Sequence, residues 1–131
     1  MIVVDTNILC YLYLEGQFTQ ISEKLLEKDA HWVAPLLWKS EFRNVIMLYI
    51  KKSIITLNDA LCIIENAEKQ MYGREYNVTS HKVINLAANS GCSAYDCEFV
   101  SLAMELNIPL ITLNKKILNK FSETSISAKA Y

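Results

Sequence analysis

The chain has 131 residues, of which 52% are hydrophobic and 21% are charged, and its formal net charge is −1. This length is typical of one domain with its own core, so we expect a single domain over residues 1–131. The near-neutral charge argues against a protein that holds nucleic acid through bulk electrostatics, and the composition is not that of a disordered chain.

Short β-branched runs alternate with helical periodicity along the first half of the chain. In order, we predict a strand at 2–4, helices at about 8–16 and 19–28, a strand at 31–33, and helices at about 35–52 and 56–71. Pro35 is expected to open the first of the two long helices, because proline is tolerated in a first helical turn. Thr56 and Asp59 form a capping-box pattern, which favours a helix start at that point.

The second half continues the same alternation. In order, we predict a strand at 75–78, helices at about 80–89 and 93–106, a strand at 109–113, a short helix at 115–121 and a last strand at 125–128. Ser93 and Asp96 repeat the capping-box pattern. Short apolar strands that alternate with helices predict an α/β domain with a mainly parallel central sheet.

Nothing in the sequence is typical of a secreted or membrane protein. The N-terminus lacks a basic segment and carries an acid at Asp5, which is unlike a signal peptide. The longest apolar runs have about seven residues, whereas a spanning helix needs roughly 20. The four cysteines form no C-x-x-C pair and are expected to be buried free thiols. We therefore expect a soluble cytoplasmic protein.

Common nucleotide-binding and covalent-catalysis motifs are absent. The three glycines are scattered, so there is neither a G-x-G-x-x-G fingerprint nor a phosphate loop ending in G-K-[ST]. His31 and His81 lie outside any nucleophile motif. These absences disfavour a nucleotide-cofactor enzyme and leave no obvious nucleophile–base pair.

Three acids are the candidate reactive groups. Asp5 follows the first predicted strand, at the edge where parallel sheets bind ligands. Glu41 lies on the apolar row of its helix and Asp96 begins an apolar stripe, where an unpaired carboxylate is costly. Each acid also has an ordinary explanation: Asp5 as a helix cap, Glu41 as an edge residue that reaches solvent, and Asp96 as part of a capping box.

Considered together, the three acids predict a metal site. If Asp5, Glu41 and Asp96 converge at one edge of the sheet, each raises the pKa of the others. Mg²⁺ or Mn²⁺ removes that penalty, because both ions prefer oxygen ligands. Such an ion can activate water and stabilise charge on a phosphate under attack. The pattern therefore favours metal-assisted hydrolysis.

Four segments resemble the PIN-domain nucleases, the fold of the VapC-type toxins of bacterial and archaeal toxin–antitoxin pairs. They are residues 3–7 (VVDTN), 40–45 (SEFRNV), 93–103 (SAYDCEFVSLA) and 109–116 (PLITLNKK). Each segment alone is weakly specific. Their order and spacing across nearly the whole chain make the resemblance specific.

This resemblance implies a three-layer α/β/α sandwich and an Mg²⁺- or Mn²⁺-dependent endoribonuclease. The positions of the family's metal-binding catalytic acids are taken by Asp5, Glu41 and Asp96. The polar residues that follow the first acid, and the hydroxyl that shapes the site, are matched by Thr6, Asn7 and Thr112. For a toxin, the resemblance also implies a homodimer, a tRNA or other structured RNA as target, and a cognate antitoxin protein.

One position departs from the family pattern. The family usually has a fourth acid where this chain has Asn114, whose carbonyl oxygen can bind a metal but brings no charge and cannot act as a base. Glu98 is a candidate substitute, but it lies about 200° around the helix from Asp96, which argues against a shared ion. We expect a weakened second metal site, one firm metal, and low or narrowly conditional activity.

Basic and aromatic residues near the motifs are candidate RNA contacts. The lysines that follow the last motif, and that are placed to hold RNA phosphates beside a metal, are Lys115, Lys116 and Lys120. The tyrosines with a possible stacking role are Tyr11, Tyr13 and Tyr95, although aromatic core packing is the favoured interpretation for them.

Three other protein classes share part of this pattern. A haloacid-dehalogenase-type phosphatase needs a second aspartate where this chain has Asn7, and a receiver domain needs an acid pair that is absent here. A non-catalytic PIN-like subunit that binds RNA or a protein partner stays an alternative because of Asn114. Manganese binding through Asp5 and Asp96 would distinguish a nuclease from such a subunit.

Overall fold

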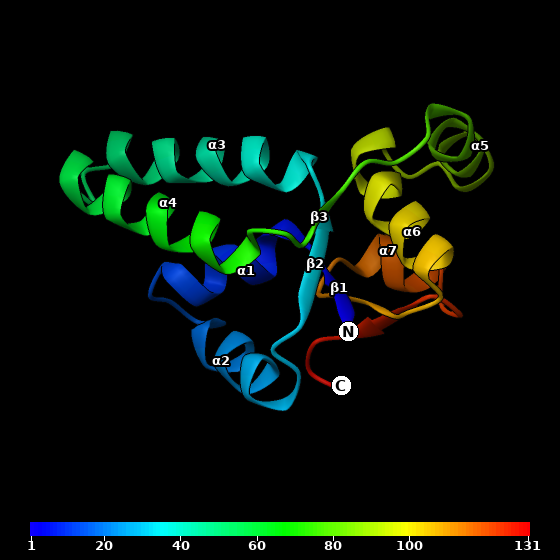
Figure 1. The fold of residues 1–131 in the computed structure, drawn as a ribbon, viewed down its shortest axis with the longest axis horizontal. Helices are drawn as coiled ribbons and strands as arrows, with labels where there is room; N and C mark the ends of the chain where they lie inside the picture. Colours follow the sequence, from blue (N-terminus) through cyan, green and yellow to red (C-terminus); the bar gives the residue numbers. More distant parts are fainter.

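A five-stranded sheet runs through the centre of the molecule in the computed structural model, which describes residues 1–131 (Figure 1). Its strands are β1 (Ile2–Val4), β2 (Trp32–Pro35), β3 (Glu75–Tyr76), β4 (Leu110–Thr112) and β5 (Ser125–Ser127). The spatial order is β3-β2-β1-β4-β5, and every neighbouring pair is parallel. Because β1 is central, the residue that follows it lies at the middle of the carboxyl edge.

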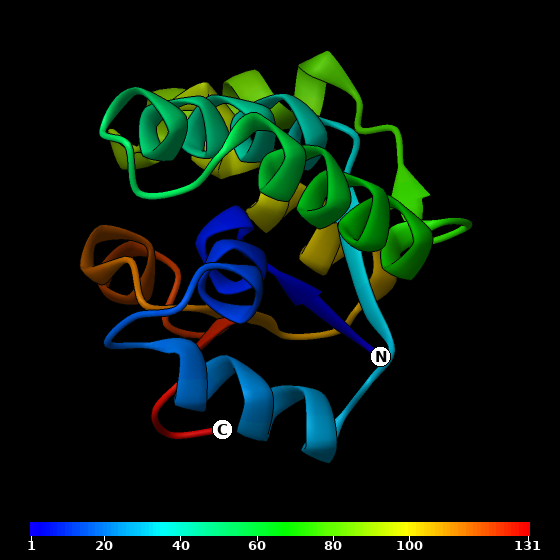
Figure 2. The ribbon, with the colours of Figure 1, turned by 90° about the vertical axis from the view of Figure 1, so that its left-hand side faces the viewer.

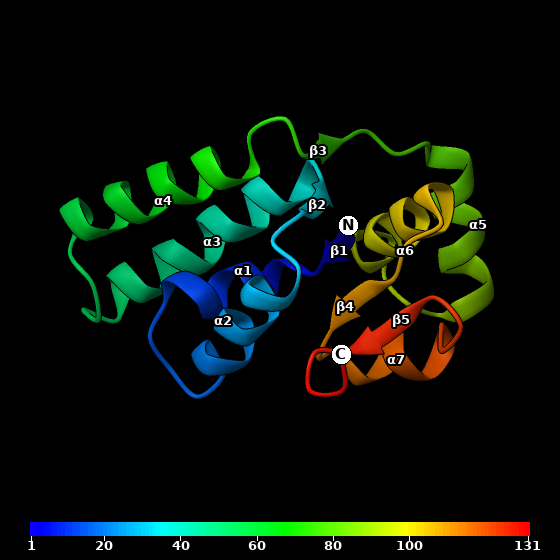
Figure 3. The same cartoon turned by 60° about the horizontal axis from the view of Figure 1, so that its bottom comes forward.

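Helices cover both faces of the sheet. They are α1 (Thr6–Tyr13), α2 (Thr19–Lys28), α3 (Leu37–Lys51), α4 (Leu57–Met71), α5 (Ser80–Ser90), α6 (Ala94–Leu106) and α7 (Lys115–Lys120). Figures 1 and 3 show α1 to α4 on one side of the sheet and α5 to α7 on the other. In Figure 2, α3 and α4 run side by side. The predicted α/β/α sandwich with a parallel sheet is confirmed.

The core explains why the strands are short and uniformly apolar. Ile2, Val3 and Val4 are fully buried, as expected for a parallel strand that helices cover on both faces. On one face, Trp38 and Phe42 of α3 pack edge to face at 5.6 Å between ring centroids. On the other face, α6 is buried over most of its circumference and packs on β1, β2 and β4. This packing brings the start of α6 to the carboxyl edge of the sheet.

The start of α3 differs from the prediction. Pro35 does not open the helix but ends β2, where it pairs with Tyr76 of β3, and α3 begins at Leu37. The Leu36 N–H donates to the Tyr76 carbonyl at 3.1 Å, so strand pairing continues past the proline. Neither the end of a strand nor the first turn of a helix needs the N–H that proline lacks, so proline is suited to both positions. The other predicted helices and strands are present, most with slightly different ends.

Two further sequence expectations concern cysteines and membranes. All four cysteines are free, but only Cys10, Cys92 and Cys97 are buried, because Cys62 lies on the solvent side of α4. None of the helices combines the length and the apolar character needed to cross a membrane.

Candidate active site

Asp5 lies at the carboxyl end of β1 and is tied to the neighbouring strand. It occupies the N-cap position of α1, yet its side chain makes no capping hydrogen bond. Instead, its Oδ2 accepts a 2.7 Å hydrogen bond from the Thr112 hydroxyl. Thr112 is the last residue of β4 and is fully buried. The helix-cap explanation therefore accounts for the backbone of Asp5, while its carboxylate is held by a tertiary contact.

Glu41 of α3 is joined to the same strand end through Thr6. The Thr6 hydroxyl, in the first residue of α1, donates to Glu41 Oε1 at 2.6 Å. α1 and α3 pack against each other, and the buried Phe42 next to Glu41 anchors α3 in the core. Glu41 is half-buried and does not simply extend into solvent. Thr6 thus orients the second acid beside the first.

Asp96 enters the site from the start of α6. Ser93 Oγ accepts the Asp96 N–H at 3.0 Å, but no hydrogen bond returns from the Ser93 N–H to the Asp96 carboxylate. The capping box is therefore only half formed. The Asp96 carboxylate raises the pKa of both Asp5 and Glu41, which places the three acids within electrostatic range of one another.

The three acids have no cationic partner. None of the ion pairs in the molecule includes Asp5, Glu41 or Asp96. Burial raises the pKa of Asp5 above its ordinary value of 3.8 and that of Glu41 above 4.5. Hydrogen bonds from Thr112 and Thr6 lower these pKa values, and neighbouring carboxylates raise them again. A bound cation would offset both the cost of burying these carboxylates and the repulsion between them.

Cys10 lies beside the acids but is unsuited to act as a nucleophile. Burial, together with the charges of Asp5 and Glu41, raises the pKa of its thiol to about 12. The thiolate is the reactive form of cysteine, so this thiol is inert near neutral pH. The site offers carboxylates and hydroxyls, which suits hydrolysis by an activated water.

Asn114 is placed differently from the three acids. It is the N-cap of α7, and its Oδ1 accepts the N–H groups of Lys116 at 3.0 Å and Ile117 at 3.2 Å. A carbonyl oxygen has two lone pairs, so both are engaged. The Asn114 N–H donates to Thr112 Oγ1 at 3.0 Å, which links its backbone to the residue that holds Asp5. The site thus includes the backbone of Asn114, whereas its amide oxygen serves the helix.

The other polar residues predicted from the sequence lie around the acids. Asn7 is exposed on the first turn of α1, two residues after Asp5. Lys115 is exposed at the start of α7. Lys116 donates from Nζ to the Gly91 carbonyl at 2.6 Å, which links α7 to the loop before α6. This contact gives Lys116 a structural role that the sequence pattern did not indicate.

The tyrosines divide into core and surface residues. Tyr11 packs against Phe18 with ring centroids 5.0 Å apart, and Tyr13 donates to Gln70 Oε1 at 2.5 Å. Both are half-buried, as core packing predicts. Tyr95 is 63% exposed directly beside Asp96, so core packing is the wrong interpretation for this residue.

Sequence reasoning missed the relation between Glu98 and Glu41. Glu98 is half-buried on α6, and its carboxylate raises the pKa of Glu41. Helical periodicity relates Glu98 only to residues of its own helix such as Asp96, whereas Glu41 belongs to α3. The only available sequence signal was a carboxylate inside an otherwise apolar helical segment.

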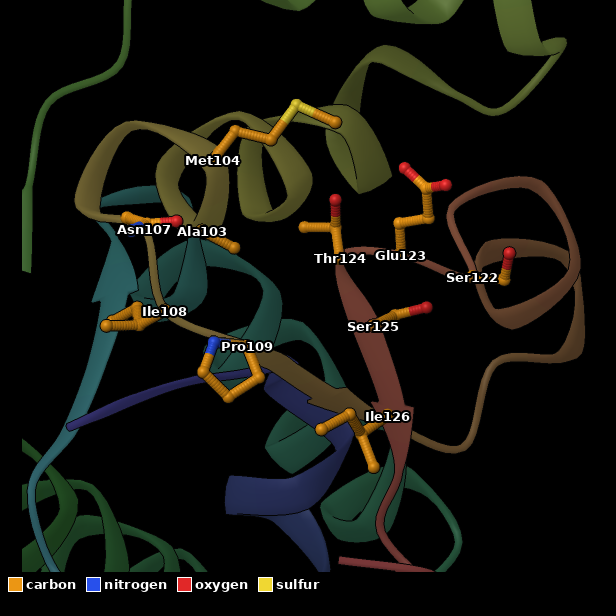
Figure 4. Close-up of a pocket in the computed structure, with 10 residues that line it drawn as sticks. All are labelled: Ala103, Met104, Asn107, Ile108, Pro109, Ser122, Glu123, Thr124, Ser125 and Ile126. Atoms are coloured by element: carbon orange, nitrogen blue, oxygen red, sulfur yellow. The ribbon is translucent and has the colours of Figure 1, made fainter.

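A pocket of about 650 Å³ lies elsewhere in the molecule (Figure 4). It is formed by the end of α6, the segments that precede β4 and β5, and the first residues of β5, and includes Met104, Pro109, Glu123 and Ser125. These residues mark the amino ends of β4 and β5. The acids lie at the carboxyl edge, so the two sites are at opposite ends of the strands.

An α/β sandwich with uncompensated carboxylates at the carboxyl edge of its sheet defines a candidate hydrolase. The model of the PIN domain family matches residues 2–123, and the chain belongs to this family. A search of curated protein sequences finds no significant match.

Several solved structures have the same fold. PAE2754 from Pyrobaculum aerophilum is 16% identical with a TM-score of 0.77, over 98% of this chain and 90% of that chain. A toxin–antitoxin complex from Klebsiella pneumoniae is 17% identical with a TM-score of 0.68, over 100% of both chains. FitAcB from Neisseria gonorrhoeae is 14% identical with a TM-score of 0.74, over 98% of this chain and 99% of that chain. At these identities the similarity establishes the fold.

Proposed function

We propose that the protein is a single-domain endoribonuclease that depends on Mg²⁺ or Mn²⁺, with Asp5, Glu41 and Asp96 as its metal-binding acids. The observation that carries this proposal is that Thr112 and Thr6 hold Asp5 and Glu41 at the carboxyl edge of the sheet, and that neither acid nor Asp96, whose charge raises the pKa of both, has a cationic partner. PIN domains are generally nucleases and typically depend on divalent metals, so membership of the family supports the same conclusion.

The chemistry of the donor set fits such an ion. The available ligands are carboxylate oxygens, which Mg²⁺ and Mn²⁺ prefer. As the side chains stand, no group of three or more His, Cys, Asp and Glu residues is placed to hold a metal ion together. Mg²⁺ usually keeps several waters and needs only one or two protein carboxylates, so an open arrangement is compatible with it. When bound, the ion supplies an activated water and stabilises charge on a phosphate under in-line attack.

The residues of the chain hold this site in place before RNA arrives. Thr112 fixes one oxygen of Asp5, and Thr6 fixes one oxygen of Glu41. Each hydroxyl therefore leaves the other carboxylate oxygen for a cation. Because both hydroxyl residues are buried, the two acids need little reorganisation when the ion binds.

RNA is the substrate that the surroundings of the site favour. Tyr95 is exposed beside Asp96 and offers an aromatic face on which an unpaired base can stack. Lys115 is exposed next to Asn114 and is placed to contact a phosphate. The overall charge of −1 means that these local contacts, rather than bulk attraction, hold the strand. We expect a tRNA or another structured RNA with an accessible loop.

The biological role proposed for this nuclease is that of a cytoplasmic toxin in a type II toxin–antitoxin pair. The Klebsiella structure is a toxin–antitoxin complex that matches over both full lengths, and another matching structure is FitAB bound to a DNA fragment. Exposed apolar side chains on and between α3 and α4 offer a surface for a protein partner. They are Met47, Leu48, Ile54, Leu57 and Leu61. A cognate antitoxin and a homodimer are the partners proposed.

The test is cleavage of a mixed pool of tRNA and structured RNA in the presence of Mn²⁺. The wild-type protein is compared with Asp96→Asn, and with Asp59→Asn as a matched control at the start of a different helix. Cleavage by wild type and Asp59→Asn, abolished by EDTA and absent in Asp96→Asn, supports the proposal. Equal cleavage by Asp96→Asn would contradict it.

A non-catalytic PIN-like subunit is the second candidate function. The observation in its favour is Asn114, since the position lacks a charge and its oxygen caps α7. If wild type cuts no RNA with any of several metals and also fails to bind Mn²⁺, the chain belongs to this class. Binding of Mn²⁺ that requires Asp96 excludes it.

A further inference from the structure

Three lysines line a cavity between α2 and the segment that follows β5. The cavity has a volume of about 420 Å³, and Lys24, Lys28 and Lys129 are among its 7 lining residues. None of the lining residues is acidic. In a chain with a formal net charge of −1, this cavity is a local region of positive charge.

The three lysines differ in what their ammonium groups contact. Lys28 donates from Nζ to the Tyr131 carbonyl and lies 4.3 Å from the centre of the Tyr131 ring, so it holds Tyr131 against α2. Lys24 and Lys129 are exposed, and none of the ion pairs in the molecule includes either of them. These two lysines are therefore available to an anion from outside the chain.

The acids of α2 do not reach into the cavity. The residues of α2 that line it share one face, because they are three or four positions apart. They are Ile21, Lys24, Leu25 and Lys28. Glu23 and Glu27 are exposed, do not line the cavity, and form no ion pair with a lysine. The lining of the cavity therefore carries positive charge only.

Backbone and side-chain contacts connect this cavity to the candidate active site. Ala128, which lines the cavity, donates its N–H to the Thr112 carbonyl at 3.0 Å. The hydroxyl of Thr112 in turn holds Asp5 at 2.7 Å. Because β5 is parallel to β4, it ends at the same carboxyl edge as the acids. Lys129 therefore follows a strand end that lies one strand beyond Thr112.

An aromatic pair forms a second connection between Lys129 and the site. Lys129 Nζ lies 5.8 Å from the centre of the Phe18 ring, which is within the range of a cation–π contact. Phe18 packs on Tyr11 of α1 with ring centroids 5.0 Å apart. Since α1 begins directly after Asp5, the cavity adjoins the site through α1 as well as through β5.

We propose that Lys24 and Lys129 bind backbone phosphates of an RNA strand that leaves the candidate active site past the end of β5 and follows α2. This inference rests on the proposed nuclease function, which places the bond to be cut at the acids. Lys115 follows β4 as Lys129 follows β5, and both are exposed. The lysines therefore extend from the acids across the β4 and β5 ends of the sheet edge.

A phosphate backbone fits this arrangement better than a compact anion does. Lys24 and Lys129 belong to different elements, so together they form a groove that a strand can follow. The acids of the site repel phosphates, and cations beside them offset this repulsion. Contacts with phosphates carry no base information, so they position a strand whatever its sequence.

The test measures binding of a fluorescein-labelled single-stranded oligouridine of roughly 12 nucleotides to the full chain by fluorescence anisotropy. The measurement is made in EDTA, so that metal-dependent cleavage does not occur. Lys24→Gln and Lys129→Gln are each expected to weaken binding about fivefold at about 0.1 M salt, since one phosphate contact contributes roughly 0.7 to the logarithmic salt slope of a single strand. The double variant is expected to lose about 25-fold and to lower that slope by about 1.4.

The matched control is the double variant Lys51→Gln, Lys52→Gln. It removes the same amount of charge at the outer end of α3, where both lysines are exposed (Figure 1). Its affinity is expected to stay close to that of wild type. Lys129→Arg keeps the charge and is expected to keep the affinity. A thermal melt of each variant checks that it folds.

The outcomes distinguish this inference from the proposed function. Equal binding by the Lys24, Lys129 double variant and by the control overturns the inference and leaves the nuclease proposal standing. Binding of polyglutamate or uridine monophosphate as tight as that of the oligouridine, and lost in the same double variant, also overturns RNA as the occupant. If Asp96→Asn cuts RNA like wild type, the proposed function fails, whereas the binding measured in EDTA is unaffected.

Discussion

The starts of α4 and α6 have the same local pattern, a hydroxyl residue followed three positions later by aspartate. At α4 the pattern forms a complete capping box. Thr56 Oγ1 accepts the Asp59 N–H at 3.1 Å, and Asp59 Oδ2 accepts the Thr56 N–H at 3.3 Å. At α6 the hydroxyl of Ser93 caps the helix, but the carboxylate of Asp96 makes no bond in return.

The difference follows from where each helix begins. Figure 1 shows α4 starting at the outer end of the α3–α4 pair, away from the sheet, and both residues of its box are exposed. α6 starts at the carboxyl edge of the sheet, where Asp96 is half-buried and interacts with Asp5 and Glu41. A carboxylate that accepts the N-cap N–H of its own helix is structural, whereas one that makes no such bond is free for a ligand.

The two helix starts should differ most when the charge of their aspartate is removed. Asp96→Asn should weaken Mn²⁺ affinity and RNA cleavage by roughly 100-fold, because a carboxylate of the metal site is lost. Asp59→Asn should leave both unchanged, since Asp59 contacts only its own helix. A calorimetric Mn²⁺ titration and a cleavage assay measure the two effects. Similar losses in both variants would mean that the aspartates do not differ in role.

Removing the two hydroxyl caps should have a smaller effect. Ser93→Ala and Thr56→Ala should each lower the free energy of unfolding by about 1 kcal/mol, since each leaves the first turn of a helix without its cap. Only Ser93→Ala should also weaken Mn²⁺ binding, by a few fold, because its helix start carries Asp96. Urea denaturation and Mn²⁺ titration of both variants test this. A binding defect in Thr56→Ala would contradict the comparison.

Acidity should affect the stability of the metal-free protein through Asp5 and Glu41. Their pKa values in the folded protein lie above the ordinary values. At a pH between the ordinary and the raised values, the folded protein therefore binds more protons than the unfolded chain. Stability is therefore lost as the pH rises from about 4 through the raised pKa values. Glu41→Gln should reduce this loss, whereas Asp59→Asn should keep it. Thermal melts in EDTA across this pH range measure the slope, and an unchanged slope in Glu41→Gln would refute the prediction.

The smallest effect concerns the loop that precedes α6. Lys116→Met removes the hydrogen bond to the Gly91 carbonyl and should lower the free energy of unfolding by about 0.5–1 kcal/mol. Lys115→Met should leave stability unchanged and weaken RNA cleavage only, because Lys115 is exposed at the start of α7. Urea denaturation and cleavage of the same RNA pool separate the two roles. Equal stability losses would show that Lys115 also has a structural contact.

Part of the candidate site could be derived from local sequence. The sequence predicts Asp5 because it directly follows a β-branched run, and ligands bind at the carboxyl ends of the strands in a parallel sheet. Glu41 and Asp96 were identified because a carboxylate on an apolar helical row needs a partner. These arguments use only the spacing of apolar and acidic residues along the sequence. They cannot predict a contact with a residue on another helix or strand, such as the hydrogen bond between Thr6 and Glu41.

Two details could not be derived in that way. Pro35 suits both a strand end and a helix start, and pairing with Tyr76 decided between them. Asn114 can bind a metal or cap a helix, and the N–H groups of Lys116 and Ile117 decided that it caps. In each case the residue type allowed both outcomes. The choice depended on which neighbours the fold supplied.

The sequence by itself determined the alternation of strands and helices, the buried parallel sheet, and the acids that need compensation, because these follow from periodicity and from the cost of burying charge. Only the tertiary structure decided which hydroxyls hold Asp5 and Glu41, and that the charge of Asp96 acts on both acids. The physical reason is that the electrostatic interaction between carboxylates depends on distance in space, which α3 and α6 set by packing on β2 and β1.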